Sequence, residues 1–145
     1  MKKCDIKEVC ILDNLNYASE DNLIECLKYY SKSNQITGGI LELDPDRYES
    51  GKGKYYLING KPFISVKYSL WYDEKSTKQD FLDHYIDLIN NEKPNIHNIS
   101  GYSVVNVHPW SMNISDIDYL VSKLNKHIEI VYVNELIDLI KENIK

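Results

Sequence analysis

Apolar and polar positions change along the chain in blocks that predict strands and helices in turn. Short apolar runs bounded by turn-forming residues are typical of buried strands. Six segments fit this description: Glu8–Leu12, Ile36–Leu43, Tyr55–Ile58, Phe63–Tyr68, Tyr102–Val107 and Ile128–Val133. Between the third and fourth segments, Asn59-Gly60 supplies the positive φ angles of a tight turn, so these two strands should form a hairpin.

Between the strands lie stretches with apolar residues three and four positions apart, which predict amphipathic helices. Each stretch begins at a polar residue that can cap the first turn of a helix. These expected caps are Ser19, Ser76 with Gln79 as a capping box, Ser115 and Asn134.

Strands and helices that alternate in this way favour parallel pairing, because each helix returns the chain to the same end of the sheet. We therefore predict one α/β domain over residues 1–145, with a mostly parallel sheet of about six strands, flanking helices and one β-hairpin insertion. A closed eight-stranded barrel usually needs ~200 to 250 residues, so the expected sheet is open or a partial (β/α) barrel. The chain could then be a fragment or a short relative of a longer barrel protein.

Polar and aromatic residues follow the predicted strands at the ends where ligands usually meet such sheets. The candidate substrate-binding and acid/base residues share this position: Asp13 and Asn14; Asp44, Asp46 and Arg47; Lys67 and Trp71; and Asn106, His108 and Trp110. Strand alternation places Asn106 and His108 on the same face of their strand.

This mixture of carboxylates, an imidazole and flat rings suits a carbohydrate. The carboxylates Asp13, Asp44 and Asp46 are the acid/base candidates, and His108 would position or protonate the substrate. A structural interpretation stays open, because Asp and Asn are common where strands end in turns. Tryptophan side chains are also frequent packing residues.

Charge and composition exclude several other classes of function. The formal net charge of −5 argues against a nucleic-acid partner, because binding phosphates needs a basic surface. No apolar run approaches ~18 residues, which argues against a membrane span. The first residues, MKKCDIKEVC, do not resemble a signal peptide, so we expect a cytoplasmic protein unless the chain was cut from a longer secreted one. The three cysteines show no metal-ligand spacing, and we expect neither metal nor other cofactor.

Three segments resemble a known family: Gly53–Trp71 (GKYYLINGKPFISVKYSLW), Gly101–Met112 (GYSVVNVHPWSM) and His127–Ile140 (HIEIVYVNELIDLI). They are similar to the C-terminal barrel domain of bacterial proteins classed as glycoside hydrolases and named for a GxGYxYP motif. That motif itself is not in this sequence. The resemblance covers the chain from about Val9 to Ile140, and it places Lys67, His108 and Trp110 at polar strand ends that family members share.

Two hypotheses follow from the residues and the resemblance. The first is a carbohydrate-active domain of the glycoside-hydrolase type, in which the aspartates hydrolyse a glycan bound by Lys67 and Trp110. The second is a non-catalytic carbohydrate-binding module or remnant that keeps only the aromatic rim. Because Glu8–Leu12 would form an open sheet edge, we also expect either a homodimer or an additional N-terminal part that covers this edge.

Overall fold

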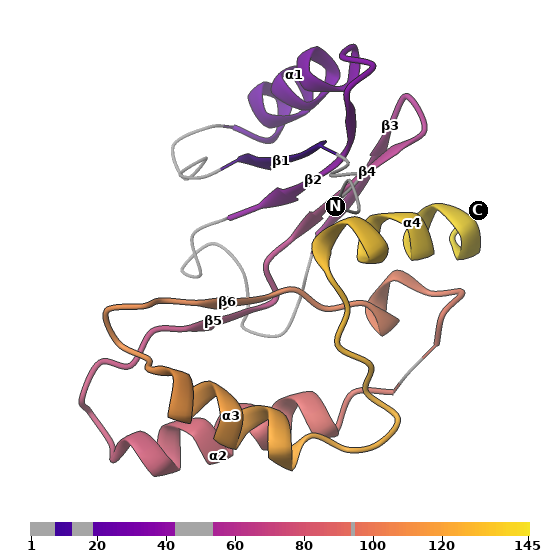
Figure 1. Ribbon diagram of the computed structural model, residues 1–145. Helices are drawn as coiled ribbons and strands as arrows, with labels where there is room; N and C mark the ends of the chain where they lie inside the picture. Colours follow the sequence, from indigo (N-terminus) through magenta and orange to yellow (C-terminus); the bar gives the residue numbers. More distant parts are fainter. Residues whose placement is uncertain (1–7, 13–18, 43–53, 94) are drawn as a thin grey trace, which may run out of the picture.

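The computed structural model describes residues 8–12, 19–42, 54–93 and 95–145 of the chain (Figure 1). Its strands and helices follow one another in this order: β1 (Glu8–Leu12), α1 (Glu20–Ser31), β2 (Ile36–Leu41), β3 (Tyr55–Ile58), β4 (Lys61–Ser65), β5 (Tyr68–Leu70), α2 (Lys78–Asn90), the 3₁₀ helix η3 (Ile99–Gly101), β6 (Val105–Val107), α3 (Ile114–Lys123) and α4 (Val133–Asn143). No helix within these ranges is long and apolar enough to cross a membrane.

The larger sheet has four strands in the order β1-β2-β4-β3. The first three run parallel, and β3 is antiparallel to β4. The turn between β3 and β4 has positive φ at both Asn59 (52°) and Gly60 (73°), as a two-residue hairpin turn requires. The predicted Asn-Gly hairpin is therefore confirmed.

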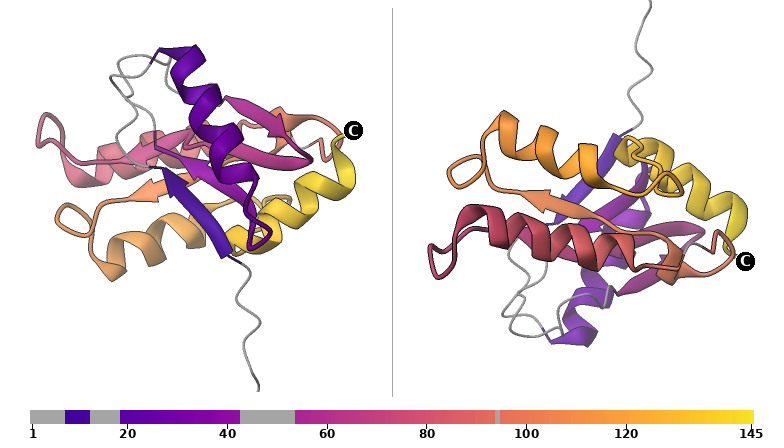
Figure 2. Two further views of the ribbon diagram at one scale, coloured as in Figure 1. Left: turned by 90° about the horizontal axis from the view of Figure 1, so that it is seen from above. Right: turned by 90° about the horizontal axis from the view of Figure 1, so that it is seen from below.

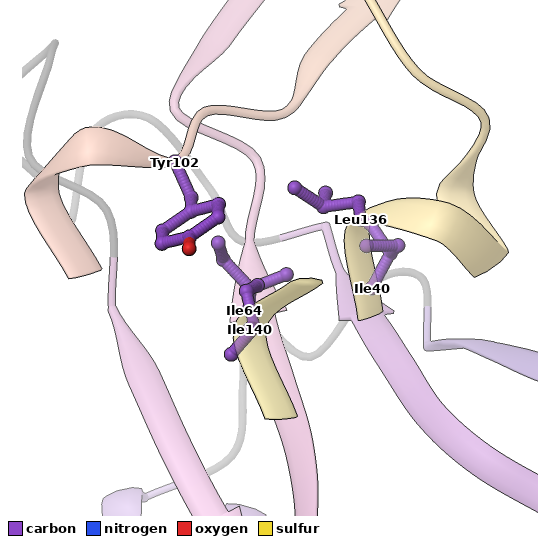
Figure 3. Close-up of a cluster of buried hydrophobic side chains, with 5 residues drawn as sticks. All are labelled: Ile40, Ile64, Tyr102, Leu136 and Ile140. Carbon is purple, nitrogen blue, oxygen red and sulfur yellow. The ribbon is translucent and has the colours of Figure 1, made fainter. Parts of the chain in front are cut away.

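Helices α1 and α4 cover opposite faces of this sheet. Alternation along β2 and β4 sends Leu41 and Phe63 towards α1, where Leu23 and Leu27 complete a buried cluster. The neighbouring residues point the other way and pack against α4 (Figure 3), in a cluster of Ile40, Ile64, Tyr102, Leu136 and Ile140. The central strands β2 and β4 are thus buried on both faces of the sheet.

Gly38 in β2 allows α4 to approach the sheet closely. A Cβ at this position would lie 2.7 Å from the Pro62 carbonyl oxygen and 2.8 Å from Ile137 Cγ2. The Ile137 side chain is fully buried, so the space that glycine leaves is filled by the helix.

The smaller sheet consists of β5 and β6, which run parallel with Leu70 opposite Val107. Helices α2 and α3 lie side by side against it (Figure 2). Together these elements enclose a third apolar cluster, formed by Leu70, Leu82, Ile86, Met112 and Leu120.

One continuous segment, residues 61–70, joins the two sheets. The Val66 N–H donates to the Leu41 carbonyl beside β2 (2.9 Å), whereas the Lys67 N–H donates to the Val104 carbonyl beside β6 (2.9 Å). Adjacent amides of an extended chain point to opposite sides, so this segment exchanges its partners at Val66 and Lys67. The end of β2 and the start of β6 are thereby held on either side of it.

The predicted fold was wrong in its architecture. The described strands form two small sheets and no barrel, instead of one mostly parallel sheet of about six strands. The expected strand Phe63–Tyr68 is divided because its two halves pair with different neighbours. The expected strand Ile128–Val133 is absent: residues 128–132 pair with no strand, and Val133 already begins α4.

The N-cap residue predicted from the sequence is confirmed for one of the four α-helices. Ser19 caps α1 and accepts a hydrogen bond from the Asn22 N–H at 3.3 Å. The other three helices begin one or two residues away from the expected caps, at Thr77, Asn113 and Tyr132. Thr77 and Asn113 lie close to other cap-forming residues, so local sequence alone does not select the cap there, whereas Tyr132 makes no side-chain cap hydrogen bond.

Candidate functional site

Aromatic residues emerge side by side at the C-terminal ends of β5 and β6. Because Leu70 is opposite Val107, the residues that follow, Trp71 and His108, leave the sheet next to each other. The turn after His108 is closed by the N–H groups of Ser111 and Met112, which both donate to the His108 carbonyl at 3.0 Å.

We call Trp71, His108 and Trp110 the ring cluster. The His108 ring centroid lies 4.9 Å from that of Trp110 and 5.5 Å from that of Trp71. The two indoles are 6.5 Å apart and nearly perpendicular, with an interplanar angle of 87°. His108 is 9% exposed, but Trp71 and Trp110 are 60% and 73% exposed. Exposed tryptophans gathered over a buried imidazole are more typical of a binding surface than of a core.

The imidazole of His108 is fixed by β5. Its Nε2 lies 2.9 Å from the Ser69 hydroxyl oxygen, and the tautomer of the ring decides which of the two donates the hydrogen bond. Ser69 and Trp71 are two positions apart on β5 and its extension, as are Asn106 and His108 on β6. These four residues therefore share one face of the small sheet.

Asn106 connects this face to the end of β2. Its Nδ2 donates to Glu42 Oε1 at 2.6 Å. Glu42 is half-buried and directly follows β2. Glu42 is not among the residues predicted from the sequence, although alternation indicates it: a carboxylate follows the buried Leu41 and must point to the opposite face.

The structure does not bring Lys67 together with His108. Lys67 precedes β5, so it lies at the opposite end of the small sheet from the ring cluster. Its Nζ pairs with Glu92 Oε1 at 2.7 Å, and the side chains of Lys67 and Glu92 are only 11% and 18% exposed. Glu92 also accepts hydrogen bonds from the hydroxyls of Tyr68 and Ser103.

The pKa of Tyr68, which donates its hydroxyl hydrogen to Glu92, is shifted by these surroundings. Burial raises the pKa of Tyr68 well above its usual range, and the hydrogen bond to Glu92 and the charge of that carboxylate raise it further. Lys67, Tyr68, Ser103 and Glu92 thus form a closed polar network, which suits a structural role better than ligand binding.

Five candidate residues lie outside the described residues: Asp13, Asn14, Asp44, Asp46 and Arg47. Within the described ranges, no three His, Cys, Asp or Glu side chains gather closely enough to hold a metal ion. The described part of the candidate site therefore consists of the ring cluster with Ser69, Asn106 and Glu42. It offers ring faces for stacking, polar groups for hydrogen bonds to hydroxyls, and one carboxylate, Glu42, which is bonded to Asn106.

A solved structure of comparable fold is described as a putative hydrolase from Bacteroides thetaiotaomicron. It superposes on this chain with a TM-score of 0.70 and 26% sequence identity. The similarity covers 93% of this chain but only 26% of the solved one, so this chain spans about a quarter of that protein's length. A comparison with curated proteins found no match.

The family resemblance seen in the sequence is confirmed over almost the whole chain. The matching family is described as the GxGYxYP putative glycoside hydrolase C-terminal domain, and the match extends over residues 1–141. The chain therefore belongs to the GxGYxYP glycoside-hydrolase-like C-terminal domain family.

Proposed function

We propose that this domain binds a glycan over Trp71 and Trp110 and takes part in its hydrolysis. The observation that carries the proposal is the ring cluster itself: two exposed indoles meet over a buried, hydrogen-bonded imidazole. The family to which the chain belongs supports a carbohydrate as the ligand class.

The geometry of the rings suits a sugar. Pyranose rings present apolar C–H faces, and an indole offers a large flat surface against which such a face can pack. Because Trp71 and Trp110 stand at 87° to each other, they can contact a face and an edge of the same saccharide unit. Asn106 and Ser69 on the adjoining face supply hydrogen-bonding groups for hydroxyls.

Hydrolysis requires acid/base groups as well as a platform. In the usual mechanisms two carboxyl groups flank the scissile bond, ~5 to 9.5 Å apart. Asp13, Asp44 and Asp46 remain predicted candidates for these groups. His108 is the described imidazole at the platform, where it would orient the substrate or donate a proton.

The alternative is a carbohydrate-binding domain without catalysis. One observation favours it: in the described part of this face, Glu42 is the single carboxylate, whereas the ring platform is complete. Both alternatives predict glycan binding, and only the first predicts cleavage.

Binding and product analysis on one panel of glycans separate these alternatives. Intrinsic tryptophan fluorescence is a direct probe, since the chain contains only two tryptophans and both belong to the ring cluster. We expect Trp71→Ala and Trp110→Ala each to weaken binding about tenfold, which corresponds to ~1.4 kcal/mol. Tyr29→Ala is a matched control, because Tyr29 is a 73% exposed ring on α1. A wild-type protein that binds no glycan of the panel would contradict the proposal.

A further inference from the structure

We propose that the glycan bound at this site contains amino sugars, with a protonated amino group paired to Glu42. This inference rests on the proposed glycan binding and names the class of glycan. Neither the family description nor the solved relative's title names a sugar.

Glu42 and the ring cluster belong to one continuous surface at the small sheet. Asn106 Nδ2 donates to Glu42 Oε1 at 2.6 Å. Asn106 is the register partner of Ser69, so both side chains leave the paired strands on the same face. The Ser69 hydroxyl oxygen lies 2.9 Å from His108 Nε2, and the His108 ring adjoins both indoles. An oligosaccharide can follow this series of neighbouring side chains, so no single sugar unit has to reach both Glu42 and the indoles.

The contact with Glu42 fixes which way the Asn106 amide points. A carboxylate oxygen can only accept a hydrogen bond, so the amide must present its NH₂ group to Glu42. The Asn106 carbonyl oxygen is then directed away from Glu42, and it accepts no hydrogen bond from a described residue. Glu42 Oε2 likewise has no donor within the described ranges. Both of these groups are acceptors, so a ligand that satisfies them must supply hydrogen-bond donors.

Among the described side chains, Glu42 also has no positively charged partner. It is half-buried, and it is bonded to the neutral amide of Asn106. Lys67, the lysine predicted for this site, is held by Glu92 at the other end of the small sheet. A carboxylate partly withdrawn from water without a cation is unfavourable, and hydrogen bonds between charged groups are roughly twice as strong as neutral ones. A protonated amine is therefore the donor that this position favours most.

The same features disfavour acidic glycans. A uronate or sulfate group brings acceptors and negative charge to a surface whose open groups are acceptors. The formal net charge of −5 adds an attraction for cationic ligands over the whole molecule. The indoles are compatible with this choice, because an indole face attracts cations as well as sugar C–H groups. Charge and hydrogen bonding thus select the same class, a glycan with free amino groups.

Oligosaccharides of chitosan, cellulose and chitin separate charge from shape. They share one linkage and differ at one carbon of each sugar, which carries an ammonium, a hydroxyl or an acetamido group. Tryptophan fluorescence at a mildly acidic pH, where the amines are protonated, measures their binding. We expect wild type to bind the chitosan oligosaccharide about tenfold more tightly than the other two. Added salt should lower this ratio, because salt screens a partly exposed charge pair.

Glu42→Gln retains an acceptor for Asn106 and removes the charge, so it should bring the ratio of chitosan to cellulose affinity close to one. Glu25→Gln is the matched control, since it removes the same charge from an exposed position on α1 and should leave the ratio unchanged.

Two results would overturn the amino-sugar assignment and leave glycan binding intact. One is a wild-type protein that binds glycans without preferring chitosan oligosaccharides. The other is a ratio that Glu42→Gln lowers no more than Glu25→Gln does. Absence of binding to any glycan would instead contradict the proposed function.

Discussion

At the residue scale, the half-buried carboxylate of Glu92 binds three other side chains. The side chains of the adjacent residues Lys67 and Tyr68 and of the distant Ser103 converge on it, and that of Lys67 carries an ammonium charge. We expect Glu92→Gln to lower the free energy of unfolding by about 3 kcal/mol, because the Lys67 charge would remain shielded from water without its partner.

Urea denaturation measures this loss. Glu25→Gln is the comparison, since its ion pair with Lys28 is largely exposed and should contribute less than about 0.5 kcal/mol. Equal effects of the two substitutions would mean that the Glu92 network does not stabilise the fold.

The raised pKa of Tyr68 leads to a prediction about alkaline pH. The folded protein keeps the Tyr68 proton at a pH where the unfolded chain, with an ordinary tyrosine pKa near ~10, has lost it. The contribution of this group to stability is therefore complete below pH ~10 and declines as the pH rises further. Urea denaturation between pH 9 and 11.5 should show a steeper fall for wild type than for Tyr68→Phe, and parallel curves would contradict this.

The sequence predicts which residues share a face of a strand better than it predicts which residues lie together in the candidate site. Alternation correctly places Asn106 and His108 together, and the ends of paired strands bring Trp71 beside them. Lys67 is predicted near them from a single strand Phe63–Tyr68, but that strand is divided in the structure and Lys67 precedes β5. Its partner Glu92 comes from a distant loop, which no local pattern reveals. Glu42 was missed because the predicted strand Ile36–Leu43 includes it, whereas β2 ends at Leu41.

At the scale of elements, the contact between β2 and α4 depends on Gly38. An added Cβ would meet both a backbone oxygen and Ile137, so Gly38→Ala should destabilise the protein by about 1 to 3 kcal/mol. The double variant Gly38→Ala/Ile137→Val tests the cause. Gly38→Ala should cost less beside Ile137→Val than in wild type, because valine lacks the Cδ1 atom that would lie 2.9 Å from the added Cβ, while the contact with Cγ2 stays. A neutral Gly38→Ala would show that the helix can move away without cost.

Elements whose conformation depends on a few adjacent residues were predictable from the sequence. Elements that depend on a hydrogen-bonded neighbouring strand were not. The β3–β4 hairpin follows from Asn59-Gly60, because few residue pairs adopt two positive φ angles. Residues 128–133 are rich in β-branched side chains, yet strand formation also needs a hydrogen-bonded neighbour. Here Val131 packs against the α4 cluster while Ile130 and Tyr132 are exposed, and the backbone joins no sheet.

At the scale of the whole molecule, the order of the strands in the described residues leaves β1 at the edge of the large sheet. An edge strand can pair with another chain, and we expect the purified protein to form dimers through β1 at micromolar concentration. Light scattering after size-exclusion chromatography measures the mass. Val105→Lys is the control, because it alters the separate β5–β6 sheet and should leave the dimer unchanged. A protein that stays monomeric at ~100 µM would contradict the expectation.

The central claim is that a glycan lies against both tryptophans. A ¹H–¹⁵N correlation spectrum tests it most directly, because a chain with two tryptophans has two indole N–H signals, and both report on the ring cluster. Titration with a bound oligosaccharide should shift both signals together, with one dissociation constant. If a glycan that binds the protein leaves both indole signals unmoved, the carbohydrate lies elsewhere and the account is wrong.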